Sequence, residues 1–180
     1  LQNNNYEIFY KDTIHPITNM KEVSDIILVS SDSDFLNYVK SKDHKIKVVR
    51  RNLSLESSTS DLRETLISLL KNKIINIGKS KIILIRTFSR NRIKNHILKQ
   101  LVSYLSIFTN KDTAIMARKI EGTIYKDLST SLQSFGLGEK NHFERDILYE
   151  RMNGGFAIRT NKLKDFLKYK PIRVGLVETE

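Results

Sequence analysis

The chain has 180 residues, of which 39% are hydrophobic, and it carries a formal net charge of +11 without a single cysteine. This length is enough to bury a core in one domain or in two small ones, and the lack of cysteine excludes disulfide bridges, thiolate zinc sites and a cysteine nucleophile. No apolar run approaches the ~20 residues that cross a bilayer. We therefore expect a soluble intracellular protein, nuclear or cytoplasmic, without a membrane partner. Because the first residue is Leu1, we also expect the chain to be part of a longer protein or assembly.

The amino-terminal half alternates strand and helix patterns. Short runs rich in β-branched residues predict strands, and leucines at helical spacing behind a Ser/Asp start predict helices. Strands are predicted over residues 6–10, 25–30, 44–52 and 81–88, and helices over residues 34–42 and 61–74. This alternation indicates an α/β layer over residues 1–87, with a mixed sheet and flanking helices.

Beyond residue 88 the pattern changes to longer helices, because apolar residues recur there at helical spacing. Helices are predicted over residues 89–108, 113–135, 142–152 and 160–169, and strands over residues 156–159 and 171–177. The predicted fold class is therefore α/β or α+β. A helical subdomain is expected at 88–155, followed by a carboxy-terminal extension at 156–180 that returns to the sheet.

The positive charge is concentrated in one segment, since residues 79–119 contain ten basic residues and one acid, Asp112. Such a concentration creates a local field that attracts polyanions and releases their counterions. The alternative is a lysine-rich composition with a solvated face. The leading prediction is a nucleic-acid-binding domain that contacts the phosphates of DNA or RNA. Its expected binding residues are Arg86, Arg90, Arg92, Lys94, Lys99, Arg118 and Lys119.

Two carboxylates, Asp32 and Asp34, follow the apolar run in the stretch DIILVSSDSDF. A carboxylate pair just past the carboxyl end of a buried strand lies where open α/β sheets place their chemistry. Their oxygens are suitable ligands for Mg²⁺ or Mn²⁺. The alternative needs no metal, because Ser and Asp at a helix start accept hydrogen bonds from its first N–H groups. Both interpretations stay open at this point, and the helix cap is the favoured one.

The stretch ILVSSDSDFLNYVKSKDHKIKVV resembles the strand–loop–helix–strand core of PIN-like nucleases of the NYN type, over residues 25–50. The resemblance implies that Asp32 and Asp34 bind metal, with Asp61 as a further acid. That family carries another acid on an earlier strand, and the short segment upstream of the motif leaves the catalytic set incomplete or altered. A divergent metal-dependent nuclease is accordingly the first alternative function.

The stretch AIMARKIEGTIYKDL resembles a helix of the central domain of transcription elongation factor S-II, and also a helix of KIX-type activator-binding domains. With the basic segment before it, the similarity extends over residues 90–128. It implies a protein-docking module in a transcription or chromatin complex, which is the second alternative. Transcript cleavage is not implied, because the zinc ribbon of the elongation factor needs cysteine.

The stretch NIGKSK contains Gly-Lys-Ser but does not make a phosphate-binding P-loop. Lys73 occupies the position of the upstream glycine, and the segment precedes a strand instead of opening a helix. No nucleotide is therefore expected as a partner. Whether the protein is an enzyme is left open by the sequence.

Overall fold

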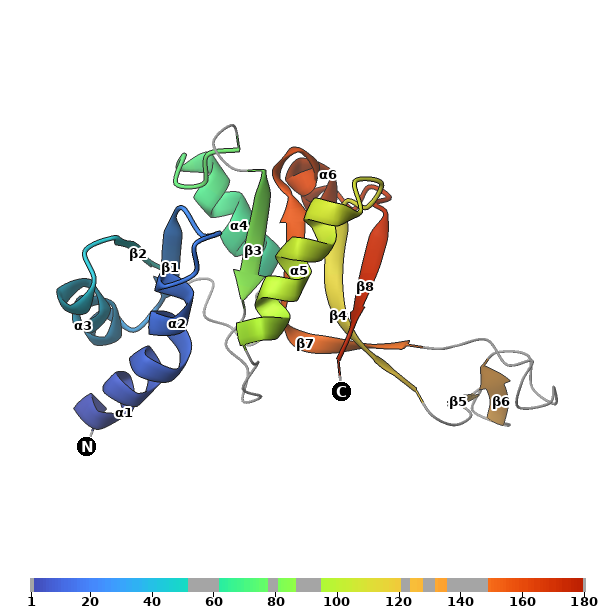
Figure 1. The fold of residues 1–180 in the computed structure, drawn as a ribbon, viewed down its shortest axis with the longest axis horizontal. Helices are drawn as coiled ribbons and strands as arrows, with labels where there is room; N and C mark the ends of the chain where they lie inside the picture. The colour runs from blue at the N-terminus through green and yellow to red at the C-terminus, as the bar shows by residue number, and fades with distance from the viewer. Residues whose placement is uncertain are drawn as a thin grey trace. The chain divides into compact units, whose positions relative to one another are not determined.

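The computed structural model describes residues 2–51, 62–77, 81–86, 95–120, 124–127, 132–135 and 149–179. The chain divides into two compact units. The amino-terminal unit comprises Leu1–Lys81 with Leu167–Lys170, and the carboxy-terminal unit comprises Ile82–Phe166 with Pro171–Glu180 (Figure 1). The predicted α/β class is confirmed, because both parallel and antiparallel strand pairs are present with helices beside them.

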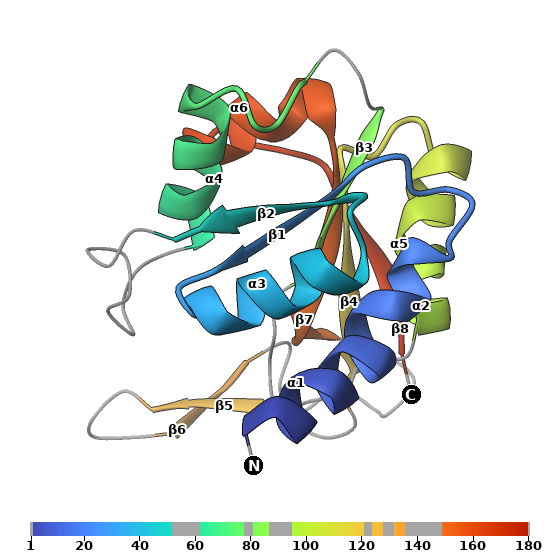
Figure 2. The ribbon, with the colours of Figure 1, turned by 90° about the vertical axis from the view of Figure 1, so that its left-hand side faces the viewer.

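The amino-terminal unit is built around two parallel strands joined by a helix. Strand β1 pairs with β2 from Ile26↔Ile46 to Ser30↔Arg50, and α3 makes the crossover between them (Figure 2). Its elements are α1 (Gln2–Phe9), η1 (Tyr10–Ile14), α2 (His15–Thr18), β1 (Ile26–Ser30), α3 (Ser33–Lys42), β2 (Ile46–Arg50) and α4 (Leu62–Lys71). The strands and helices predicted for residues 25–52 and 61–74 are confirmed where the structure describes them.

The strand predicted over residues 6–10 is wrong, because these residues lie in α1 and the first turn of η1. Tyr6 and Phe9 both contact the ring of Phe35, each with ring centroids 5.4 Å apart, and Tyr10 meets Tyr38 at 6.4 Å. Positions three and four apart share one helix face. The aromatic residues of YEIFY therefore follow a helical period and not a strand alternation.

The core of the amino-terminal unit lies where α3 meets the two strands. Its buried residues are Ile14, Leu28, Phe35, Leu36, Val39 and Ile46. Val39 is fully buried, and three of the six come from α3, so the apolar face of this helix closes one side of the β1–β2 pair.

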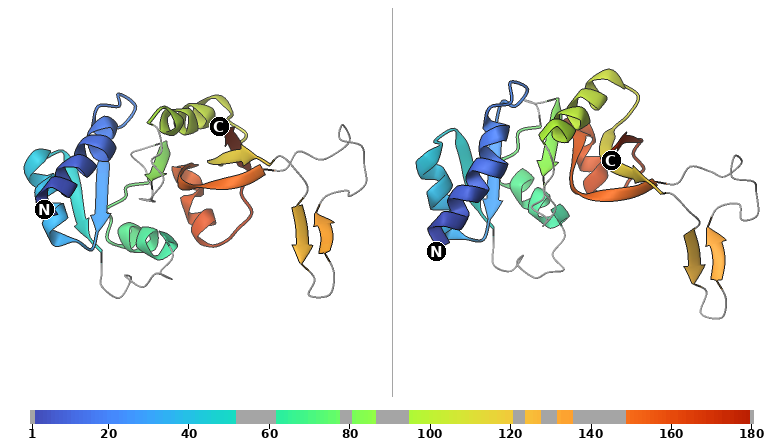
Figure 3. Two further views of the ribbon diagram at one scale, coloured as in Figure 1. Left: turned by 90° about the horizontal axis from the view of Figure 1, so that it is seen from below. Right: turned by 60° about the horizontal axis from the view of Figure 1, so that its bottom comes forward.

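The carboxy-terminal unit contains a four-stranded sheet in the order β3-β7-β4-β8. Strand β7 is antiparallel to β3 and β4, whereas β8 is parallel to β4. Helix α5 packs on one face and α6 on the other, where the rings of Phe156 and Phe166 lie 5.4 Å apart (Figure 3). The elements are β3 (Ile82–Arg86), α5 (Asn95–Ile107), β4 (Thr113–Lys119), β5 (Ile124–Asp127), β6 (Leu132–Phe135), β7 (Tyr149–Arg159), η4 (Thr160–Lys162), α6 (Leu163–Leu167) and β8 (Val174–Glu178).

The helices predicted over residues 113–135 and 142–152 are wrong where the structure describes them. The first stretch forms β4 and the antiparallel pair β5–β6, and residues 149–152 begin β7. Strand β4 is covered on both faces, so Thr113, Ala114, Met116 and Ala117 are all buried. A strand buried on both faces has no polar alternation, and its apolar residues also satisfy a helical period. The predicted helix at 89–108 is confirmed over α5, and residues 89–94 lie outside the described part.

Across the described segments, no helix combines the length and the apolar character that crossing a membrane requires.

Gly155 allows β7 to approach β3 closely. A Cβ at this position would lie 2.8 Å from the carbonyl oxygen of Ile85 and 3.6 Å from the Cα of Arg86. The second distance is an ordinary contact, but the carbonyl oxygen is too close and belongs to the backbone of the paired strand, so it can yield only if the β3–β7 ladder shifts.

We expect Gly155→Ala to lower the free energy of unfolding by about 1–3 kcal/mol, as is typical when a methyl group is forced into a packed site. Urea unfolding followed by circular dichroism measures this effect. Ser103→Ala, on the exposed side of α5, is the control and should change little. An unchanged midpoint for Gly155→Ala would show that the two strands tolerate the methyl group.

Candidate functional site

The carboxyl ends of β1 and β2 lie side by side in the amino-terminal unit. Ser30 is opposite Arg50 in the parallel ladder, and the N–H of Arg51 donates a hydrogen bond of 2.8 Å to the carbonyl oxygen of Ser30. Ser30, the last residue of β1, therefore lies beside two consecutive arginines, Arg50 at the end of β2 and Arg51 just after it. Ligands of open α/β sheets bind outside this edge. Hydroxyl and guanidinium donors are the groups that bind phosphate oxygens.

Asp32 is the residue that shapes the turn after β1. Its Oδ1 accepts a hydrogen bond of 2.9 Å from the N–H of Phe35, which makes it the N-cap of α3. Its Oδ2 accepts a hydrogen bond of 2.7 Å from the hydroxyl of Tyr6. These two donors hold the pKa of Asp32 below its usual range, with the backbone N–H as the larger cause. The charged carboxylate is thus used to start a helix, as a charged N-cap should be.

The bond to Asp32 also fixes Tyr6 of α1 against the crossover helix. Accepting the phenolic proton stabilises the neutral form, so the pKa of Tyr6 is raised, first by this hydrogen bond and then by burial. The same ring packs on Phe35. One aspartate therefore joins α1, the β1 turn and α3.

Of the three predicted metal ligands, the structure describes Asp32 and Asp34. Asp34 is exposed in the first turn of α3, beside the cap, and Asp61 lies outside the described residues. Over the segments that the structure describes, no three or more His, Cys, Asp or Glu side chains are grouped so as to hold a metal ion. Asp32, in the turn after β1, already has a hydrogen-bond donor on each carboxylate oxygen.

The predicted basic residues lie on several elements of the carboxy-terminal unit. Arg86, at the end of β3, is half-buried, and this burial lowers its pKa. Arg118 is paired with Glu150 at 2.6 Å, while Lys99 on α5 and Lys119 on β4 are exposed. The other three predicted positions, Arg90, Arg92 and Lys94, lie outside the described residues.

Sequence reasoning missed Ser30, Arg50 and Arg51 as site residues. Their signal was the ending VVRRN of the second strand, which places two arginines at a strand end. It was overlooked because the parallel pairing that brings this end beside the β1 turn is a tertiary feature.

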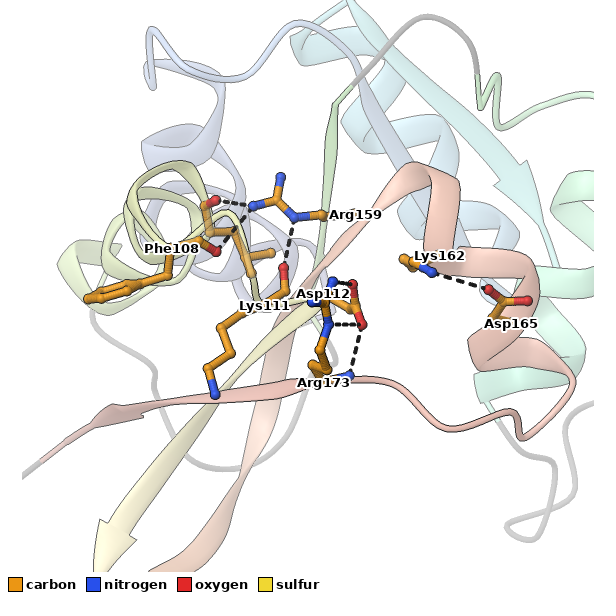
Figure 4. Close-up of polar contacts among 8 residues, drawn as sticks. Phe108, Lys111, Asp112, Arg159, Lys162, Asp165 and Arg173 are labelled. Carbon is orange, nitrogen blue, oxygen red and sulfur yellow. Dashed lines mark hydrogen bonds and ion pairs between the residues drawn. The ribbon is translucent and has the colours of Figure 1, made fainter.

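The second polar cluster lies in the carboxy-terminal unit, at the start of β4 and β8 (Figure 4). Arg173 donates to both carboxylate oxygens of Asp112, from Nε at 3.1 Å and from Nη2 at 3.0 Å, and its backbone N–H adds a third bond of 2.9 Å. Asp112 is 4% exposed. The Arg173 guanidinium is the main reason that the pKa of Asp112 is lowered to about 2.

Arg159 forms the other half of this cluster. Its guanidinium donates to the carbonyl oxygens of Lys111 at 2.8 Å and Phe108 at 3.3 Å, and to that of Leu105. These carbonyls lie at or just after the carboxyl end of α5, where the helix leaves them without intrahelical partners and where a cation is favoured. These hydrogen bonds connect the end of β7 to the carboxyl end of α5 and the turn after it, and the Asp112–Arg173 pair connects the residues that precede β4 and β8. The cluster therefore anchors strand and helix ends.

No family model matches the sequence, and no curated protein matches it. Solved structures do match. One is a CMP:2-keto-3-deoxy-manno-octonic acid synthetase complexed with CTP, with a TM-score of 0.62, 10% identity, and coverage of 95% of this chain and 79% of the other. Another is the 4-diphosphocytidyl-2C-methyl-D-erythritol synthase of Anaerococcus prevotii DSM 20548, with a TM-score of 0.64, 16% identity, and coverage of 94% and 76%. A further 4-diphosphocytidyl-2C-methyl-D-erythritol synthase structure has a TM-score of 0.64 and 13% identity, and the match covers 94% of this chain and 78% of the other. At these identities the likeness establishes the fold that the chain shares with them.

The comparisons overturn the two family resemblances and the functions that followed from them. A fold shared with cytidine-nucleotide enzymes over 94–95% of the chain is neither that of PIN-like nucleases nor that of elongation factor S-II or KIX-type domains. The predicted nucleic-acid-binding domain, its nuclease and docking alternatives, and the expectation of no nucleotide are therefore wrong. Two local patterns misled the sequence analysis. Residues 25–50 form a βαβ unit with a capped helix, which many folds contain, and residues 114–119 and 124–127 are strands instead of a helix.

We expect Asp32→Ala to lower the stability of the amino-terminal unit by about 1 kcal/mol, because α3 loses its N-cap. Asp32→Asn should retain most of the stability, since Asn caps as well as Asp. Asp34→Ala is the matched control, because Asp34 is exposed in the first turn of the same helix and does not cap it. Chemical unfolding monitored by tyrosine fluorescence measures the differences. Equal losses for the Asn and Ala variants would contradict the cap and favour a role for the charge itself.

Asp112 should make the free energy of unfolding decrease as the pH falls into the acid range. Its pKa of about 2 in the folded chain lies below the ~3.9 of an unfolded aspartate, so its contribution is present above pH ~4 and is lost as the pH falls towards 2. We expect Asp112→Asn to destabilise by about 1–3 kcal/mol at neutral pH, with a difference from the wild type that shrinks at low pH. Urea unfolding at several pH values measures it. Glu150→Gln, which removes an exposed ion pair, should change stability by less than ~1 kcal/mol, and a larger effect than that of Asp112→Asn would contradict the assignment.

Proposed function

We propose that the chain is the core of a nucleotidyltransferase that binds CTP and transfers its cytidylyl group to an acceptor. The observation that carries this proposal is the shared fold over 94–95% of the chain with enzymes whose names include CMP and diphosphocytidyl products, one of them complexed with CTP. The likeness alone gives the fold. The polar edge of the amino-terminal unit supplies the second support.

The nucleotide is expected at the carboxyl ends of β1 and β2, outside which ligands of open α/β sheets bind. Arg50 and Arg51 follow each other at the end of β2, beside Ser30 and Ser31 of the β1 turn. Arginine offers a planar set of donors suited to phosphate oxygens and an apolar face that stacks on aromatic rings. Arg50 is exposed and Arg51 is half-buried, so we assign Arg50 to the phosphates and Arg51 to the wall of the site.

The reaction at such a site is a substitution at phosphorus. An acceptor oxygen forms a bond to the α-phosphorus of CTP, the bond from that phosphorus to the bridging oxygen breaks, and pyrophosphate leaves with the electron pair. The proton of the acceptor hydroxyl goes to solvent or a base. Phosphoryl chemistry of this kind depends mainly on positioning and on cations that stabilise the developing negative charge, which is the role we give to Arg50.

A divalent cation, Mg²⁺ or Mn²⁺, fits this proposal as a companion of the triphosphate. Mg²⁺ is usually bound through one or two carboxylates together with substrate phosphates, and it keeps several waters. The described residues do not form a metal centre of their own, and the oxygens of Asp32 are engaged in the helix cap. We therefore assign no catalytic step to a protein-bound metal.

The charge of +11 also fits this substrate class. CTP, its pyrophosphate product and an anionic acceptor are all attracted by a positive field. The positive charge that indicated a nucleic acid as the partner therefore also fits a much smaller polyanion.

The test is calorimetric titration of the protein with CTP in the presence of Mg²⁺. We expect CTP to bind more tightly than ATP or GTP, and Arg50→Gln to weaken CTP binding by about ten- to hundredfold, because a charge-assisted hydrogen bond contributes roughly 1.5–3 kcal/mol. The matched control is Lys47→Gln, which removes a positive charge from the other end of the same strand. Absence of CTP binding by folded protein, or equal weakening by both variants, would overturn the proposed site.

A further inference from the structure

Tyr6 of α1 reaches the turn after β1 from outside the β1–β2 crossover. Its hydroxyl donates a hydrogen bond of 2.7 Å to Oδ2 of Asp32, 26 residues further along the chain. The ring of Tyr6 packs on two aromatic rings of α3, with centroid distances of 5.4 Å to Phe35 and 6.0 Å to Tyr38. The aromatic contacts therefore hold the hydroxyl of Tyr6 in place against Asp32.

Asp32 connects this hydroxyl to the ends of both parallel strands. Its Oδ1 accepts from the N–H of Phe35 at 2.9 Å, and its own N–H donates to Oγ of Ser30 at 3.2 Å. The carbonyl oxygen of Ser30 in turn accepts from the N–H of Arg51 at 2.8 Å. A continuous chain of hydrogen bonds thus leads from α1 to the edge at which we place the nucleotide.

The hydroxyl of Ser30 is a donor that this chain leaves available. A serine hydroxyl can donate one hydrogen bond and accept two. In the described part of the chain, the hydrogen bond of this oxygen is the one that it accepts from Asp32. Ser30 is half-buried at the end of β1, opposite Arg50. A donor in such a position is stabilised when a ligand brings an acceptor to it, and an anionic acceptor gives the stronger bond.

Tyr6 prevents Asp32 from becoming that acceptor. A carboxylate oxygen that loses a donor accepts from another donor within reach, because an unsatisfied charged group costs free energy. The hydroxyl of Ser30 belongs to the same turn and already contacts the backbone of Asp32. As long as Tyr6 donates to Oδ2 and Phe35 donates to Oδ1, both oxygens of the carboxylate are satisfied.

We infer that Ser30 donates its hydrogen bond to a phosphate oxygen of the nucleotide, and that Tyr6 is a positioning residue that keeps this donor free by occupying Asp32. The inference rests on the proposed function, because it needs a phosphate at the carboxyl ends of β1 and β2. It adds a neutral donor on β1 to the guanidinium donor that we assign to Arg50 on β2. It also gives α1 a role in binding, although none of its residues touches the ligand.

A double-mutant cycle in CTP affinity tests the inference. Tyr6→Phe removes the hydroxyl and keeps the ring, and Ser30→Ala removes the donor. In calorimetric titrations with CTP and Mg²⁺, we expect Ser30→Ala to weaken binding by about tenfold, because a hydrogen bond to a charged group is lost. Tyr6→Phe should weaken it by a smaller factor. Since Tyr6 acts through Ser30, the double variant should bind CTP as Ser30→Ala alone does.

Tyr38→Phe is the matched control, because it removes a hydroxyl from the same aromatic cluster without touching Asp32. We expect it to leave CTP affinity unchanged. Urea unfolding of each variant establishes that the titrated protein is folded. If Ser30→Ala does not fold, Ser30→Cys takes its place in the cycle, since a thiol fills similar space and donates only weakly.

The outcomes separate this inference from the proposed function. Folded wild type that binds no CTP overturns the proposed function and the inference with it. CTP binding that is weakened by Arg50→Gln, but not by Ser30→Ala and Tyr6→Phe, overturns the inference alone. Losses that multiply in the double variant contradict the action of Tyr6 through Ser30. Equal losses for Tyr6→Phe and Tyr38→Phe would assign the effect to the aromatic cluster and likewise overturn it.

Discussion

Two parallel strands cannot be joined by a tight turn, and this constraint determines the site of the amino-terminal unit. The chain must leave β1, cross over the sheet and enter β2 from the same end, and α3 is the segment that does so. The carboxyl ends of the two strands are thereby brought to one edge. Helix α3 begins shortly after β1, and its N-cap, Asp32, donates from its N–H to the hydroxyl of Ser30 at that edge. The position of the polar groups is thus a consequence of the crossover.

Asp32 and Asp112 show how similar carboxylates acquire different structural roles. The first is exposed and caps a helix with the help of a tyrosine hydroxyl. The second is buried and accepts from Nε and Nη2 of Arg173, while the neighbouring Arg159 donates to the carbonyl of Leu105 near the end of α5 and to those of Phe108 and Lys111 after it. Both arrangements lower the pKa of the acid, and both keep it charged at neutral pH. A depressed pKa near a cluster of arginines is therefore not sufficient evidence for catalysis, since it also results from anchoring strands and helix ends.

The sequence correctly predicted those helices and strands whose residue pattern fits only one type of secondary structure. β1 and β2 are short β-branched runs with polar ends, and α3 and α4 carry Ser/Asp starts and leucine or valine stripes, so their types follow from local chemistry. β4 was mistaken for a helix because both of its faces are buried, which removes the alternation that marks a strand. α1 was mistaken for a strand because its aromatic residues are close together, and only the packing against Phe35 distinguishes the two periods. Of the candidate site, the sequence indicated the β1 turn, whereas the arginines of β2 were not predicted.

The wrong choice of partner has a related physical origin. Electrostatic attraction depends on the number and spacing of positive charges, and a basic segment attracts a nucleic acid and a nucleoside triphosphate by the same mechanism. What distinguishes the two is the shape of the surface that carries the charge, because a long polymer needs an extended accessible face. The described basic residues come from the end of β3, from α5 and from the end of β4, where Arg118 is already held by Glu150 and Arg86 is half-buried. At the end of β2, by contrast, two arginines adjoin the turn after a parallel strand, and a compact phosphate group needs only a few donors in one place. Under the proposed function, charge accounts for the sign of the ligand, and the compact edge beside β1 and β2 accounts for its small size.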